Sequence, residues 1–369
     1  MATALVIGSG FAGSTAALLL TAKGHRVTLV EREAFLGGGS KTHVHGGHPF
    51  TLGPRHFVTY DERIFAFLDR HVPLRRIEGY ELLTFVEGDP GFYHYPLHEA
   101  DLARMPDHAK IARELDARDP HAVPADLESF WLNALGPTLY AKFVERYVRK
   151  MWGIKSNTEL PAGRSSGAAG TSPIRTGTKA AWADAITAFP FARTGYDDYF
   201  TKAAEGAEVL LRTSIETFDM ERRRVRIGGE WRSFDLVIST VSPEILLNGA
   251  FGPLRWMGRE LWKLVLPVPA AFPPNVHCVF YSGDEPFMRV TEFKKFYAYE
   301  APSTLLGLEI PSSRNRLFPY PGVDDQALAR RYLNALPDRV FSLGRAGRYV
   351  YAGGISEHIA EAIALTEAL

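Results

Sequence analysis

The chain has 369 residues, of which 46% are hydrophobic and 12% aromatic. Lysine plus arginine and aspartate plus glutamate both number 42, so the formal net charge is zero and nothing favours nucleic acid or a membrane surface as a partner. This length predicts two or three subdomains. A single cysteine, Cys278, excludes an intramolecular disulfide, and no signal peptide precedes the first predicted strand, so we expect a cytoplasmic protein.

A glycine-rich turn follows the first predicted strand. Residues 4–13 read Ala-Leu-Val-Ile-Gly-Ser-Gly-Phe-Ala-Gly, and a helix is predicted over 14–22. In this pattern Gly8 permits a tight turn, Gly10 lets the backbone approach a pyrophosphate, and Gly13 lets the helix pack closely on the strand. The pyrophosphate would lie at the helix N-terminus, where free N–H groups favour negative charge. The turn therefore predicts a dinucleotide site; a structural turn in another α/β unit is the alternative.

The next segment narrows the choice of dinucleotide. A predicted strand at 26–30 ends at Glu31, about 20 residues after the glycines, where an acid can hold a ribose hydroxyl. A second glycine cluster at 36–40 allows another close approach of backbone to cofactor. This order is more similar to FAD enzymes than to NAD dehydrogenases, although a surface loop is the alternative. Further predicted cofactor contacts here are Phe11, Ala12, Glu31, Arg32, Gly38 and Gly39.

The nucleotide-binding fold is predicted in three separate pieces, at 1–75, 200–246 and 336–369. The second piece contains an apolar strand at 235–240, and the third ends in a helix at 356–369. Split pieces of one sheet imply that other domains are inserted between its strands. We therefore predict an α/β protein with a discontinuous Rossmann-like FAD-binding domain.

Two insertions are predicted. The first, 97–199, is mainly helical and includes a mobile substrate loop, with helices predicted at 101–118, 126–133 and 138–151. The second, 76–96 together with 247–335, is rich in aromatic and β-branched residues and is predicted to form an antiparallel sheet domain. Its strands are expected at 276–281, 287–291, 296–300 and 305–310.

Five segments beyond the glycine turn carry a more specific signal. They read, in chain order, YVRKMWG at 147–153, ELPA at 159–162, PIR at 173–175, PFMRVTEFKKF at 286–296 and GRAGRYVY at 344–351. Together they resemble the UDP-galactopyranose mutase family, flavoenzymes that interconvert the pyranose and furanose forms of a nucleotide sugar. The resemblance runs in order along nearly the whole chain.

The resemblance assigns roles to five side chains. It implies that Arg175 and Arg289 bind the substrate diphosphate from opposite sides and that Tyr351 donates its hydroxyl to a phosphate. Two guanidiniums suit this task because each can bind with bidentate geometry. Tyr147 and Trp152 would form the slot for the base. The alternatives are a surface ion pair for an arginine and plain core for the aromatic pair.

The resemblance also implies the chemistry. Reduced FAD would attack the anomeric carbon through N5 and displace the nucleoside diphosphate, and the flavin–sugar adduct would open and close again through a different hydroxyl. Arg175 and Arg289 would be the catalytic side chains, with an external reductant such as NAD(P)H and a homodimer possible. No metal is expected, since His43, His45 and His48 lie in a glycine-rich loop without nearby carboxylates. The remaining flavin contacts implied are Arg55, His56, Phe57, Gly344 and Arg345.

The chain departs from the family pattern at several positions. Both usual histidines of the stretch at 53–59 are replaced, by Arg55 and Val58, and a new one stands at His56. Phe318 stands where a tyrosine is usual. We therefore predict a mutase for a sugar nucleotide other than plain UDP-galactose. The alternatives are an amine-oxidase or desaturase-like oxidoreductase and a non-catalytic FAD-binding homologue.

Overall fold

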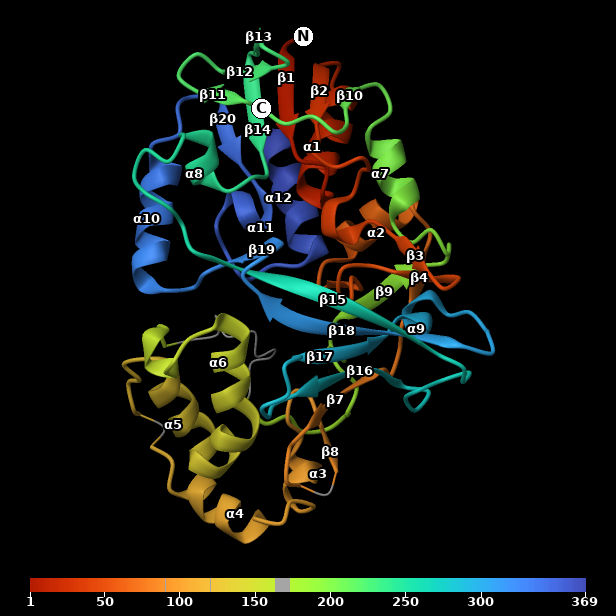
Figure 1. Ribbon diagram of the computed structural model, residues 1–369, viewed down its shortest axis with the longest axis vertical. Helices are drawn as coiled ribbons and strands as arrows, with labels where there is room; N and C mark the ends of the chain where they lie inside the picture. The colour runs from red at the N-terminus through yellow and green to blue at the C-terminus, as the bar shows by residue number, and fades with distance from the viewer. Residues whose placement is uncertain (90, 120, 163–172) are drawn as a thin grey trace.

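The computed structural model describes residues 1–89, 91–119, 121–162 and 173–369. Figure 1 shows an α/β part with both chain ends, a long twisted sheet across the middle, and a helical part beyond it. Part of the expected mobile substrate loop, residues 163–172, lies outside the described ranges. Within those ranges, no helix is both long and apolar enough to cross a bilayer.

Strands from all three predicted pieces meet in one parallel sheet of order β10-β2-β1-β14-β20, which confirms the discontinuous Rossmann-like fold. The helices α1 and α12 pack against each other beside it (Figure 1). The elements are β1 (Thr3–Ile7), α1 (Phe11–Ala22), β2 (Arg26–Val30), β10 (Glu208–Leu210), β14 (Leu236–Ser239), β20 (Val340–Ser342) and α12 (Ile355–Ala368), with an adjoining sheet of β11 (Thr217–Asp219), β12 (Arg224–Ile227) and β13 (Glu230–Ser233).

The second sheet has seven strands in the order β19-β15-β18-β17-β16-β7-β8. All neighbours are antiparallel except β7 and β16, which run parallel. As expected, residues before the helical part join strands more than 180 positions later. The strands are β7 (Glu81–Phe85), β8 (Phe92–His94), β15 (Trp256–Leu266), β16 (Val276–Tyr281), β17 (Arg289–Glu292), β18 (Thr304–Ser312) and β19 (Arg316–Pro319).

The strand predicted at 296–300 is wrong. The chain forms a short helix there, α9 (Phe293–Tyr297), which ends at Ala298 in the left-handed region with φ +48°. Phe293 and Phe296 are both buried, and the i, i+3 spacing of a helix places them on one face. Lys294 ties the following turn by donating to the carbonyls of Ala301 and Ser303.

The single helix predicted at 101–118 is also wrong, because the chain forms two helices there. Pro106 lies between them, and a proline disfavours helical conformation in the residue before it. The next helix, α5, contains a kink at Gly136, whose φ is +77°, just before Pro137. The helical elements are α3 (Glu99–Leu102), α4 (His108–Asp116), α5 (Leu127–Tyr140), a π-helical turn (Ala141–Glu145), α6 (Arg146–Trp152) and a 3₁₀ turn (Asn157–Glu159).

A small sheet, β5-β9-β6, joins segments that are far apart in sequence. Its central strand, β9 (Ile186–Pro190), pairs with β5 (Phe57–Thr59) and β6 (Leu74–Arg76), so the expected helical segment 97–199 also contributes a strand. The domain limits remain predictions. The other elements are η1 (Gly38–Ser40), β3 (His43–His45), β4 (His48–Phe50), α2 (Glu62–His71), α7 (Asp197–Ala203), α8 (Pro243–Leu246), α10 (Val323–Asn334) and α11 (Gly344–Gly347).

Candidate functional site

The three glycines of the turn between β1 and α1 have different surroundings. Gly8 has φ +91°, and a Cβ atom there would lie 2.2 Å from Thr240 Oγ1. At Gly13 a Cβ would lie 1.9 Å from the carbonyl oxygen of Gly8, so only glycine permits α1 to pack this closely. A Cβ on Gly10, in contrast, would meet no atom within 4 Å. The open space over Gly10, at an α1 N-terminus without a side-chain cap, suits an anion.

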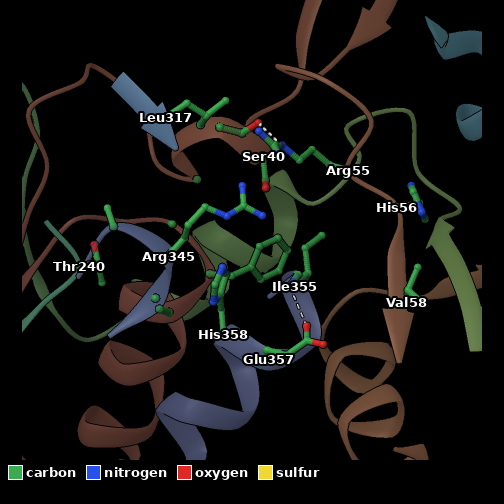
Figure 2. Close-up of a pocket in the computed structure, with 18 of the residues that line it drawn as sticks. Ser40, Arg55, His56, Val58, Thr240, Leu317, Arg345, Ile355, Glu357 and His358 are labelled. Carbon is green, nitrogen blue, oxygen red and sulfur yellow. Dashed lines mark hydrogen bonds between the residues drawn. The ribbon is translucent and has the colours of Figure 1, made fainter. Parts of the chain in front are cut away.

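A cavity of about 560 Å³ opens from this turn. Figure 2 shows side chains from several distant segments converging on it. A volume of this order is typical of small-molecule and cofactor sites. Among its lining residues are these predicted cofactor contacts: Gly10, Phe11, Ala12, Gly39, Arg55, His56, Gly344 and Arg345.

Other predicted cofactor residues lie behind the cavity wall. The buried carboxylate of Glu31 accepts hydrogen bonds from the backbone N–H of Ser9 at 2.9 Å and from its hydroxyl at 2.7 Å, so it fixes the glycine turn. Gly38 packs near Gly10, and Phe57 is buried in β5. Arg32 is mostly exposed and pairs with its neighbour Glu33. The ribose contact of Glu31 remains a prediction.

Several arginines gather around one carboxylate at this site. Arg289 on β17 binds Glu309 on β18 in a bidentate pair, with Nη2 at 2.6 and 2.8 Å from the two oxygens and Nε at 2.9 Å. Burial and then the charge of Arg345 lower the pKa of Arg55 to about 10; Glu309 opposes this shift and Arg289 adds to it. Arg55, Arg259, Arg289 and Arg345 are here called the arginine cluster. Their four positive charges exceed the negative charges of the two neighbouring carboxylates, Glu309 and, beside Arg345, Glu357. Such a cluster favours an anionic ligand.

Two members of the arginine cluster have nitrogens without a hydrogen-bond partner in the described part of the chain. Arg345 donates from Nη2 to the carbonyl of Gly353 at 2.8 Å, but its buried Nε has no such partner. Arg259 donates to the carbonyl of Gly258 at 2.7 Å, and its buried Nη2 likewise has none. Both guanidiniums lie over the ring of Phe318, at 4.8 and 5.0 Å from its centroid. The ring of Phe318 therefore provides an apolar surface against which both guanidiniums pack.

Sequence reasoning missed Arg259 and Glu309. Arg259 gave no signal, because β15 also contains Glu260 and Lys263. Glu309 is a charged residue in the otherwise apolar strand β18, where a charge needs a buried partner or a ligand. That break in the apolar pattern was the available signal for Glu309. It does not reveal the partner, because the pairing of Glu309 with Arg289 depends on the register between β17 and β18.

The second predicted substrate arginine, Arg175, lies on a segment attached to the start of α3. Its backbone N–H donates to the carbonyl of Leu97 at 2.8 Å, and Glu99 donates to its carbonyl at 2.9 Å. The half-buried guanidinium donates to the carbonyl of Ala180 at 3.2 Å. The expected placement of Arg175 opposite Arg289 across a diphosphate remains a prediction.

The three predicted aromatic substrate contacts are placed at different depths. Trp152 is 1% exposed and packs edge-on against Tyr351, with ring centroids 5.0 Å apart. Tyr147 is half-buried and contacts Phe280, over which Arg289 also lies. Burial raises the pKa of Tyr147 and of Tyr351, so both hydroxyls remain protonated donors near neutral pH. Trp152 thus forms the wall behind Tyr351, and its stacking on a base remains a prediction.

We expect the Arg55→Met variant to raise the stability of the apoprotein by about 1–2 kcal/mol, because it relieves the burial of a charge and like-charge repulsion at a predicted cofactor contact. The same change should weaken FAD binding. Urea denaturation of the apoprotein and fluorescence titration with FAD measure the two effects. The exposed Arg63, paired with Asp61, gives a matched Arg63→Met control. A destabilised Arg55→Met apoprotein would show that the charge is not costly there.

Comparisons with known proteins bear on this site. The UDP-galactopyranose mutase family model matches residues 142–351, and an NAD(P)-binding Rossmann-like model matches residues 6–71. A Klebsiella pneumoniae protein described as a probable UDP-galactopyranose mutase is 22% identical over 376 residues, covering 94% of this chain and 89% of that protein. The dTDP-fucopyranose mutase of Escherichia coli is 27% identical over 167 residues, 43% of each chain.

Shorter matches and solved structures extend the comparison. A phytoene desaturase of Rhodobacter capsulatus is 36% identical over 96 residues, which is 24% of this chain but only 18% of the desaturase. The fold resembles a reduced UDP-galactopyranose mutase with a TM-score of 0.84 at 18% identity, covering 100% of this chain and 95% of that one. It resembles putrescine oxidase less, with a TM-score of 0.63 at 14% identity over 99% and 98% of the chains. Because the family model spans more than half of the sequence, including Tyr147, Arg175, Arg289 and Tyr351, the chain belongs to the UDP-galactopyranose mutase family.

Proposed function

We propose that this protein is a flavin-dependent mutase that interconverts the pyranose and furanose forms of a nucleoside-diphosphate sugar. The observation that carries the proposal is the arginine cluster beside a dinucleotide cavity, with Glu309 as its paired carboxylate. A diphosphate needs such charge, whereas an amine or a lipid does not. The family membership supports the same reaction class.

The cavity residues fit FAD. The open space over Gly10, the uncapped start of α1 and the unpaired Nε of Arg345 offer groups for a pyrophosphate and a ring system. When bound in its reduced form, the flavin supplies N5 as the nucleophile that takes up the sugar. An external donor such as NAD(P)H would reduce it.

The side chains would hold the diphosphate and stabilise its growing charge. Glu309 holds the Arg289 guanidinium in one orientation, so little reorganisation is needed when negative charge develops. Arg175 would close on the same group, and Tyr351 would donate its hydroxyl. Holding the diphosphate beside the sugar keeps recombination effectively unimolecular, which can contribute up to about 7–11 kcal/mol.

Two departures favour a substrate other than plain UDP-galactose. Val58 lines the cavity where the family pattern has a histidine. Phe318, which stands in place of a tyrosine, contacts the guanidiniums of Arg259 and Arg345 through its ring and offers no hydroxyl to a phosphate. The E. coli relative is named for dTDP-fucopyranose, which supports a different base or a deoxysugar.

A screen of reduced holoenzyme tests the function. The purified protein should be yellow and, after dithionite reduction, should convert one member of a panel of UDP-, dTDP- and GDP-sugars to an isomer of identical mass. Turnover of UDP-galactopyranose with the others inert would contradict the altered substrate. Peroxide release with an amine would favour an oxidase, and no isomer from any sugar would favour a binding protein.

A further inference from the structure

Lys150 on α6 reaches across to the segment that connects β16 to β17. Its side chain is 14% exposed, and its ammonium lies within hydrogen-bond distance of alternate backbone carbonyls. The four acceptors are the carbonyl oxygens of Tyr281 at 3.1 Å, Gly283 at 3.0 Å, Glu285 at 2.8 Å and Phe287 at 3.0 Å.

These contacts use all of the hydrogen-bond donors of the Lys150 ammonium. A lysine has three N–H donors and no acceptor, so four carbonyls share them. The carboxylate oxygen of Glu285 lies 3.9 Å from the Lys150 Nζ, which is too far for a hydrogen bond. It therefore contributes a compensating negative charge only. Burial lowers the pKa of Lys150, while Glu285 and Asp284 oppose the shift. The connecting segment is thus folded around a cation supplied by the helix.

The ammonium joins two parts of the proposed substrate site. The carbonyl of Phe287 lies two residues before Arg289, which begins β17. On the helix, Tyr147 lies three residues before Lys150, and Trp152 two residues after it. A shift of the 281–287 segment would therefore move the Arg289 guanidinium relative to the aromatic pair.

We propose that Lys150 is a positioning residue whose ammonium organises the 281–287 segment and so sets Arg289 against Tyr147. This inference rests on the proposed function, because it takes Arg289 as the diphosphate ligand. Lys150 is not among the residues that line the cofactor cavity, and its donors are directed at backbone carbonyls. Misplacement of a binding group by about 1 Å can cost up to 10²-fold in rate, so the effect should be large.

The test uses the FAD holoenzyme and inorganic pyrophosphate as the probe, so that it needs no knowledge of the sugar. We expect Lys150→Ala to weaken pyrophosphate binding about tenfold by calorimetry, a 1.4 kcal/mol change. Propylammonium replaces the atoms that the substitution removes and should restore most of the affinity, whereas tetramethylammonium, which has no N–H, should not. Lys150→Gln is the second variant, for use if the alanine variant folds poorly. It keeps most of the side-chain volume but removes the positive charge, and it should also weaken pyrophosphate binding.

Lys142, in the π-helical turn that precedes α6, provides a matched control. Its side chain is similarly buried at 15% exposure, but it pairs with the carboxylates of Asp89 and Asp107. Lys142→Ala should lower the urea midpoint and leave pyrophosphate affinity unchanged. If Lys150→Ala behaves the same way, the positioning role is wrong while the proposed function stands. If the unsubstituted holoenzyme does not bind pyrophosphate, both the positioning role and the diphosphate site are overturned.

Discussion

We expect Arg289→Ala to lower kcat by about 10²–10³ on the sugar nucleotide identified by the screen. The substitution removes a charged hydrogen-bond donor to the diphosphate, which is the group proposed to leave the sugar and then return to it. The substitution also removes the hydrogen-bonded partner of the Glu309 carboxylate, which is 9% exposed, and should cost about 3 kcal/mol of stability. Steady-state kinetics on the FAD-loaded protein and urea denaturation measure the two effects separately.

A second substitution separates these effects. In the Arg289→Ala background, Glu309→Gln removes a carboxylate that has lost its hydrogen-bonded partner. This change should restore part of the stability, since Arg55 and Arg259 still attract a charged Glu309, without restoring turnover. Arg255 offers a matched control, because its guanidinium donates from both Nε and Nη2 to one oxygen of buried Asp325, away from the cavity lining. Arg255→Ala should destabilise the protein comparably and retain turnover. Equal losses of turnover in both variants would mean that Arg289 acts only through the fold.

The Gly10→Ala and Gly13→Ala variants should lose different properties, the first its FAD affinity and the second its stability. Gly10 has extended backbone, with φ −69° and ψ −178°, and open space at its Cβ position, so Gly10→Ala should fold normally. Its methyl group would stand where the pyrophosphate approaches, and we expect FAD affinity to fall about 100-fold, equivalent to about 2.7 kcal/mol. Fluorescence titration with FAD measures this loss.

Gly13→Ala places a methyl group 1.9 Å from the Gly8 carbonyl oxygen, a backbone atom that cannot rotate away. The helix must move off β1, and we expect a loss of about 2–3 kcal/mol in apoprotein stability despite the better helix propensity of alanine. Urea denaturation of both apoproteins makes the comparison. The interpretation fails if Gly10→Ala is the less stable apoprotein, or if it binds FAD as tightly as the unsubstituted chain.

The sequence was most informative where local rules and tertiary structure agree. The first βαβ unit was predicted from its glycines and apolar runs, because each glycine has a separate steric reason. The three-piece sheet was predicted because buried parallel strands read as short apolar runs. Likewise, the cavity gathers most of the contacts expected from the two glycine clusters and the C-terminal Gly344–Arg345 pair.

The sequence was least informative where long-range register decides. The aromatic stretch at 293–297 is a helix because its rings pack at helical spacing against β4 and β18, which propensity alone does not reveal. The pairing of Arg289 with Glu309 depends on which residues of β17 and β18 stand opposite each other. The hydrogen-bond partners of Lys150 are backbone carbonyls, which every residue has, so the sequence cannot indicate which ones it contacts.

The interleaved order of the parallel sheet has a consequence for biosynthesis. β1 pairs with β14, which lies more than 200 residues later in the chain, and β14 pairs with β20, which lies later again. Contacts of such high sequence separation form slowly, and unpaired strand edges stay exposed until their partners emerge from the ribosome. Gly344 and Arg345, which complete the cavity wall, come more than 300 residues after Gly10, which also lines the cavity. The cofactor cavity is therefore complete only after segments that are far apart in the chain have all been made and have paired.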